Sequence, residues 1–134
     1  SGPLQDPVGV NIGNHHAVFF VEDADAIDLP QHCSILERNK LFPKHANISV
    51  ATIKNTNEIR LRVWERGVGE TLACGSGACA TLVSANRRSL SGQDALVHLN
   101  GGTLHIEWLA DNHVIMTGPV ATSFSGFINP AVLN

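Results

Sequence analysis

The sequence lacks the features that mark membrane and secreted proteins. No apolar run approaches the ~20 residues that span a bilayer, and the polar opening SGPLQDP does not resemble a signal peptide, so we expect no membrane association. The chain has only three cysteines, and an odd number without secretory features favours reduced thiols over a disulfide framework. We therefore predict a cytoplasmic protein.

Positive charge is also scarce. Nine Lys and Arg residues stand against twelve Asp and Glu residues, which gives a net charge of -3, and the basic residues cluster no further than Arg87-Arg88. We expect no nucleic acid partner, because that function needs a basic surface. Repeats, low-complexity tracts and linkers are missing, and 134 residues suit one small domain with one core, which we place at residues 1–134.

Short β-rich runs make up much of the sequence. Residues 58–65 alternate apolar and polar side chains, the period of a strand with one buried face and one wet face. Residues 77–88 are small or apolar nearly all round, as in a helix buried on most sides. These patterns predict an α+β fold, a curled, largely antiparallel sheet wrapped around a central helix. Strands are expected at 8–12, 17–21, 47–54, 58–65, 95–99, 103–108 and 113–117, and a second helix at 28–36.

The most informative segment is ERGVGETLACGSGACA, at residues 65–80. It leads from a strand end through a glycine-rich turn to Cys74, directly before Gly75-Ser76-Gly77 and the small-residue helix. A helix N-terminus favours a thiolate, so we expect the pKa of Cys74 to lie below that of an ordinary cysteine. The glycines also let backbone N–H groups approach an anion closely. The segment therefore predicts a nucleophile or base beside a carboxylate or phosphate site.

The other cysteines and histidines fit structural roles better. Cys33 lies on the expected second helix, and Cys79 lies inside the central helix among alanines, as buried inert cysteines do. The C-x₄-C spacing of Cys74 and Cys79 fits zinc poorly. His15 and His16 are adjacent, so on a strand they point to opposite faces. We expect no metal site.

Four segments together resemble the diaminopimelate epimerase family, in the order in which that family has them. They are GNHHAVFFV at 13–21, FPKHANISV at 42–50, RVWERGVGETLACGSGACA at 62–80, and GGTLHIEW with VIMTGPV within 101–120. The third segment is long and highly specific, which makes chance similarity implausible. The resemblance covers nearly the whole chain but only the C-terminal half of the enzyme.

The resemblance implies a fold of two pseudo-symmetric modules with the active site between them. It implies interconversion of LL- and meso-diaminopimelate, for lysine and peptidoglycan precursor synthesis in bacteria, without pyridoxal phosphate, metal or any other cofactor. One cysteine thiolate removes the α-proton while a second cysteine thiol delivers a proton to the opposite face. Cys74 matches one catalytic cysteine, and the other belongs to an N-terminal module that is absent from this chain. The intact enzyme is expected to be a homodimer.

The family's substrate-binding residues carry over onto the central segment. Glu65 and Arg66 match residues that hold the reacting amino-acid end of the substrate. Gly75 and Ser76 match backbone donors to the α-carboxylate, in agreement with the anion site expected from the glycines.

Further polar residues carry over from the other segments. Asn14 and Asn47 match side chains that bind the substrate, and His16 and Glu65 match polar neighbours that tune the protonation of the cysteines. The family usually has proline where this chain has His15. Because proline restricts the residue before it, we expect Asn14 to be held less rigidly here.

Three functions follow from these observations. The first is half of a diaminopimelate epimerase active site, inactive without its partner module. The second is a related cofactor-independent racemase of the proline or hydroxyproline type, which the segments containing Asn14 and Glu65-Arg66 disfavour. The third is a non-catalytic binding or assembly module that keeps the fold. An exposed face between modules should make such a chain self-associate.

Overall fold

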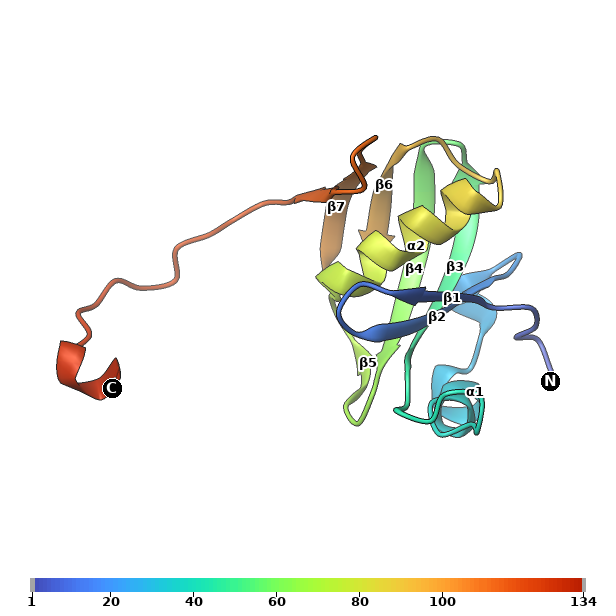
Figure 1. Cartoon of the computed structure of the whole chain (residues 1–134), viewed down its shortest axis with the longest axis horizontal. Helices are drawn as coiled ribbons and strands as arrows, with labels where there is room; N and C mark the ends of the chain where they lie inside the picture. The colour runs from blue at the N-terminus through green and yellow to red at the C-terminus, as the bar shows by residue number, and fades with distance from the viewer. Residues whose placement is uncertain (1, 134) are drawn as a thin grey trace.

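The computed structural model describes residues 2–133 and contains a mixed sheet that curls around one helix, α2 (Gly75–Arg87) (Figure 1). Five of the seven strand pairings are antiparallel, which confirms the predicted α+β class. The sheet runs in the order β1 (Val8–Asn11), β2 (His15–Phe20), β3 (Asn47–Asn55), β4 (Glu58–Glu65), β6 (Asp94–Leu99), β7 (Gly102–Trp108) and β8 (Val114–Thr117), with β5 (Gly69–Thr71) paired to β4.

The two parallel pairings have a common cause. The chain passes from β2 to β3 through the helix α1 (Leu29–Leu36), and from β4 to β6 through α2. Parallel neighbours need a long crossover, and a helix supplies it, whereas short turns join the antiparallel pairs. Each strand–helix–strand unit therefore contributes one parallel pair to a sheet that is otherwise built from hairpins.

Helix α2 lies in the concave side of the sheet and contacts strands from both ends of it (Figure 1). Its small side chains let the strands approach closely, and eight of its residues, Gly77, Ala78, Ala80, Thr81, Leu82, Val83, Ser84 and Ala85, are buried. This confirms the prediction of a helix buried on most sides. We call the resulting cluster the inner core. It includes Ile59, Leu61, Val63, Ala78, Leu82, Val97 and Ile106.

The opposite face of β4 is not wet, and that prediction was wrong. Ile59, Leu61 and Val63 are fully buried as expected, but the alternating residues Arg62 and Trp64 are half-buried. They lie beneath α1 and the short 3-10 helix η1 (Ala24–Ala26), where Arg62 Nη1 donates to the carbonyls of Ala24 and Ile27 at 2.9 and 2.8 Å. An arginine can satisfy several carbonyls at once, so a polar alternation does not require solvent.

A second cluster, the outer core, lies between α1 and the sheet. Asp28 caps α1 by accepting from Gln31 N–H at 3.0 Å, and Pro30 occupies the first turn, where its missing N–H costs nothing. The helix buries Leu29 and Cys33 against β2 and β3. Strands β2 and β3 are thus covered on both faces, which explains why each has four consecutive buried residues without alternation.

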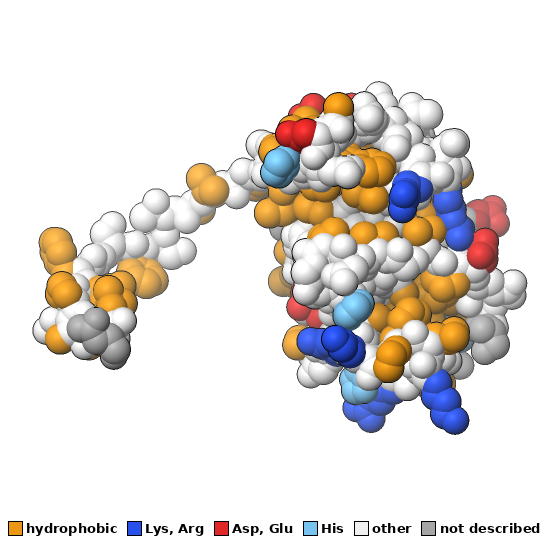
Figure 2. Space-filling view, viewed as in Figure 1, with side chains coloured by type: hydrophobic (Ala, Val, Ile, Leu, Met, Phe, Trp, Pro, Cys, Tyr) orange, Lys and Arg blue, Asp and Glu red, His pale blue; other side chains and the backbone are white. Residues whose placement is uncertain are grey.

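Residues 118–133 leave the body as an extended arm that ends in the 3-10 helix η2 (Pro130–Leu133) (Figure 1). The residues of this arm are exposed, including Val120, Phe124, Phe127 and Ile128, and Figure 2 shows apolar side chains along it. None of the helices in residues 2–133 combines the length and apolarity needed to cross a membrane.

Candidate active site

Cys74 is the N-cap of α2. Its backbone is extended, with φ -146° and ψ 100°, and its Sγ accepts from Gly77 N–H at 3.3 Å. A thiol here occupies the place of the usual serine or aspartate cap. Among the described residues the N–H groups of Gly75 and Ser76 donate to no protein acceptor, so they stay available to an anion at the helix N-terminus.

A chain of hydrogen bonds joins Cys74 to β2. Ser76 Oγ lies 3.6 Å from Cys74 Sγ and accepts from Asn14 Nδ2 at 3.2 Å. Asn14 Oδ1 lies 3.0 Å from His16 Nε2. Because the Ser76 hydroxyl already accepts from Asn14, its proton is free to point at the sulfur. Asn14 is thus held by two side chains, although His15 stands before it where the family has proline.

His16 is neutral at physiological pH. Its side chain is 2% exposed, and burial lowers its pKa from 6.5 to about 4, against the opposing pull of the Glu65 carboxylate. The amide of Asn14 donates to Ser76, so its oxygen accepts from Nε2–H of the imidazole. Nδ1 then carries a lone pair, and it has no partner within the described part of the chain. His15 is exposed, so the two adjacent histidines point to opposite faces of β2, as predicted.

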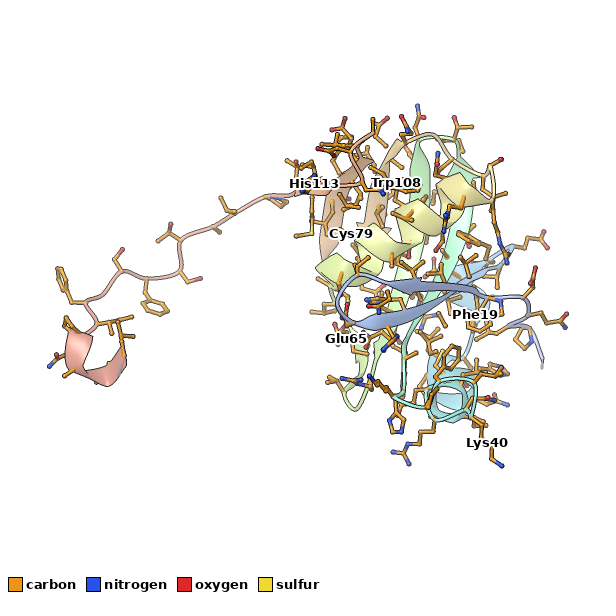
Figure 3. All side chains as sticks on the ribbon, in the orientation of Figure 1. Phe19, Lys40, Glu65, Cys79, Trp108 and His113 are labelled. Carbon is orange, nitrogen blue, oxygen red and sulfur yellow. The ribbon has the colours of Figure 1, made fainter. Side chains whose placement is uncertain are left out.

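Glu65, at the end of β4, lies beside both His16 and Cys74, since its charge acts on the pKa of each. In Figure 3 Glu65 is labelled below the β1–β2 hairpin, and Cys79 is labelled on α2 above it. Thr71 Oγ1 donates to Glu65 Oε1 at 2.9 Å. Sequence patterns did not single out Thr71, because the three-residue strand β5 that carries it has no periodicity to detect.

Asn47 and Arg66 form a pair of their own next to this network. Asn47 Oδ1 accepts from Arg66 N–H at 2.8 Å, and the exposed guanidinium donates to the carbonyl of Lys44 at 2.7 Å. The amide of Asn47 therefore fixes the turn that carries Arg66, while its NH₂ group remains for a ligand. Asn47 also lies opposite His16 in the parallel pairing of β2 and β3.

The expected depression of the Cys74 pKa was wrong for this chain. Burial raises the pKa of the thiol, hydrogen bonds from Ser76 and Gly77 N–H lower it, and the charge of Glu65 raises it again. With 9% of the side chain exposed, desolvation outweighs the two donors. Cys74 is therefore a thiol at neutral pH, with donors already in place for the thiolate.

Cys33 and Cys79 are placed differently from Cys74. Cys33 lies in the outer core, on the other side of the sheet, and burial raises its pKa to about 12. Cys79 is only half-buried, although we expected it to be buried among alanines. Within residues 2–133 no group of three or more His, Cys, Asp or Glu side chains is arranged to hold a metal ion.

An open groove of about 620 Å³ adjoins the site at Arg66. Arg38, Lys44 and His45 also line it. Figure 2 shows Lys and Arg side chains gathered at the end of the body where α1 lies, and Figure 3 places Lys40 there. The surface next to the predicted substrate residues is therefore cationic, in a chain whose net charge is negative.

The structure thus brings together most of the residues selected from the sequence. Cys74, Ser76, Asn14, His16 and Glu65 form one connected network, and Gly75 contributes a free N–H beside it. The Asn47–Arg66 pair adjoins this network rather than joining it. The arrangement places a buried thiol, a carboxylate and two free N–H groups together at the N-terminus of α2.

Solved structures with a similar fold include proteins of the PhzF family. A Bacillus anthracis phenazine biosynthesis protein of the PhzF family has a TM-score of 0.55 and 21% identity, over 85% of this chain and 36% of that one. An Enterococcus faecalis PhzF-family protein has a TM-score of 0.56 and 17% identity, over 73% and 35%. This likeness shows the fold, a curled-sheet module that matches 36% and 35% of the two solved chains.

The sequence comparisons define the family. The chain belongs to the diaminopimelate epimerase family, whose model matches residues 8–123. It is 56% identical to the diaminopimelate epimerase of Rhodospirillum centenum over 99% of this chain and 46% of the relative, and 53% identical to that of Erythrobacter litoralis over 93% and 46%. The chain therefore spans about half the length of the curated relatives it matches.

Proposed function

We propose that this chain supplies one half of the active site of a diaminopimelate epimerase. Cys74 is one of two cysteine acid/base groups, and the reaction interconverts LL- and meso-diaminopimelate without pyridoxal phosphate or metal. The observation that carries the proposal is a thiol at the N-cap of α2, with Ser76 and Gly77 N–H as donors and Glu65 beside it. Such a group can give and take a proton at carbon.

The protonation of Cys74 favours a starting role as proton donor. Burial keeps the thiol protonated in the resting chain. When the proton leaves, Ser76 and Gly77 N–H stabilise the thiolate without rearrangement, because both already point at the sulfur. In the reverse direction the same thiolate is a base in a water-poor site, where its basicity is greatest.

The N-terminal turn of α2 is suited to the α-carboxylate of the substrate. Removing an α-proton places negative charge on the carboxylate, and donors aimed at that charge lower the barrier. The N–H groups of Gly75 and Ser76 are free, and the helix dipole has its positive end there. Asn14, Asn47 and Arg66 then orient the rest of the amino acid from the adjoining strand ends.

A second cysteine acid/base must come from elsewhere. Cys33 lies behind the sheet, and Cys79 is rotated about 140° around the helix axis from Cys74. Neither can face Cys74 across a substrate held at the helix N-terminus. The proposed source is an N-terminal module that corresponds to the half of the relatives that this chain does not match. The chain alone should therefore be inactive.

The test is exchange of the diaminopimelate α-proton in heavy water. We expect negligible deuterium incorporation by this chain alone, because burial keeps Cys74 protonated and the base that removes the α-proton is proposed to lie in the other module. Robust incorporation by the isolated chain would contradict the half-site proposal. A panel containing proline and hydroxyproline, run on the chain joined to the first-half module of a relative, separates the epimerase from the racemase alternative.

A further inference from the structure

The short strand β5 brings a threonine hydroxyl to the carboxylate next to Cys74. Strand β5 pairs with the end of β4, with Thr71 opposite Val63 and Gly69 opposite Glu65. This register turns Thr71 toward the side chain of Glu65, whose Oε1 accepts from Thr71 Oγ1 at 2.9 Å. Thr71 is not among the residues that the sequence analysis assigned to substrate binding or catalysis.

The hydroxyl has one proton and two acceptors within reach. Glu65 Oε1 lies at 2.9 Å, while the carbonyl of Ala73 lies at 3.4 Å. The shorter contact is to the charged acceptor, and charge-assisted hydrogen bonds are the stronger kind. The proton of Thr71 therefore goes to Glu65, and it restrains the carboxylate at the end of β4, where the sheet ladder stops.

The position of this carboxylate matters to its neighbours. The charge of the Glu65 carboxylate raises the pKa of the Cys74 thiol. It also raises the pKa of His16, which partly opposes the effect of burial on that residue. Cys79 is a further titratable group near Cys74, since the charge of Cys74 adds to the rise that burial causes in the pKa of Cys79. A carboxylate held beside a thiol favours the protonated thiol, whereas a carboxylate free to swing into solvent loses this effect.

We propose that Thr71 is a positioning residue for Cys74: its hydroxyl fixes the Glu65 carboxylate at the side of the thiol. A role for Thr71 in catalysis rests on the proposed function, in which Cys74 is the proton donor. The positioning itself involves only the side chains of Thr71, Glu65 and Cys74. It can be tested on this chain without measuring catalysis.

The test compares Thr71→Val, which keeps the shape and loses the hydroxyl, with Thr71→Ser, which keeps the hydroxyl. Alkylation of Cys74 by iodoacetamide is followed across pH, with each cysteine resolved by mass spectrometry. We expect the midpoint for Cys74 to fall by about half a pH unit in Thr71→Val, or about threefold faster alkylation at neutral pH. Thr71→Ser should match the unaltered chain.

Two controls separate positioning from loosening. Cys79, in the same molecule and influenced only through the charge of Cys74, should shift by less than Cys74, and Thr103→Val removes a remote hydroxyl that bonds His98 Nδ1 at 2.9 Å. An unchanged Cys74 midpoint in Thr71→Val, a Thr71→Ser variant that behaves like Thr71→Val, or an equal shift at Cys79 overturns the proposal. None of these results contradicts the proposed function. The proposed function fails separately, if this chain joined to the first-half module of a relative inverts diaminopimelate without Cys74.

Discussion

The two glycines at the start of α2 should respond differently to the same substitution. A Cβ at Gly77 would lie 3.1 Å from Cys74 Sγ and 3.2 Å from Val63 Cγ2, both buried. A Cβ at Gly75 would lie 2.8 Å from Met116 Sδ, but Met116 is 51% exposed and can move aside. Only Gly77 is therefore closed in by groups that cannot retreat.

The magnitudes follow from packing and helix preference. Overpacking a core site costs about 1–3 kcal/mol, and alanine in a helix gains about 0.5–1 kcal/mol over glycine. Gly77→Ala should lose about 1 kcal/mol of unfolding free energy, a fall of about 3 °C in Tm. Gly75→Ala should stay within about 0.5 kcal/mol of the unaltered chain, since the helix gain opposes a small displacement of Met116.

Thermal and denaturant unfolding of both variants measures these differences, and alkylation of Cys74 adds a chemical reading. The added methyl at Gly77 displaces the sulfur from Gly77 N–H, one of the two donors that lower the thiol pKa, so Gly77→Ala should raise the alkylation midpoint. Equal stability of the two variants, with identical Cys74 profiles, would refute the reasoning that Gly77 seats the thiol.

Three further outcomes are expected. Ser76→Ala removes a donor that lowers the Cys74 pKa, so its alkylation should slow at a given pH; faster alkylation would count against the assigned hydrogen bond. The folded pKa of His16, about 4, lies below its unfolded value of 6.5, so the unfolded chain binds the extra proton. Stability should thus fall by about 2 kcal/mol as pH drops from 6.5 towards 4, and His16→Gln should flatten the fall in urea titrations. Truncation after Pro119 removes exposed residues and should change Tm by less than about 2 °C, while reducing any self-association seen by sedimentation.

Much of the fold was predictable because its signals are local. The alternation in β4 reports its inner face, and the small residues of α2 report a helix buried inside the sheet. The error on the outer face of β4 arose because Arg62 satisfies carbonyls of the η1 segment, far away in sequence. The strand β5 was missed because three residues cannot show a period.

The site residues could also be identified from local sequence signals, but the pKa of Cys74 could not be predicted from them. Cys74 could be placed at the start of α2 from the glycines around it, and the structure puts it at the N-cap. The rise in its pKa depends on burial by β4 and α2 and on the charge of Glu65, which only the folded chain brings together. Helix-terminus arguments alone describe an exposed thiol, which this one is not.

The central claim is that Cys74 is an acid/base group that needs a second module. The most direct measurement joins this chain to the first-half module of the Rhodospirillum centenum relative, 56% identical here, and follows α-deuteration of diaminopimelate in heavy water. We predict α-deuteration with inversion by the joined protein, none by this chain alone, and none after Cys74→Ala in the joined protein. Inversion that survives Cys74→Ala, or that the isolated chain already catalyses, would contradict the account.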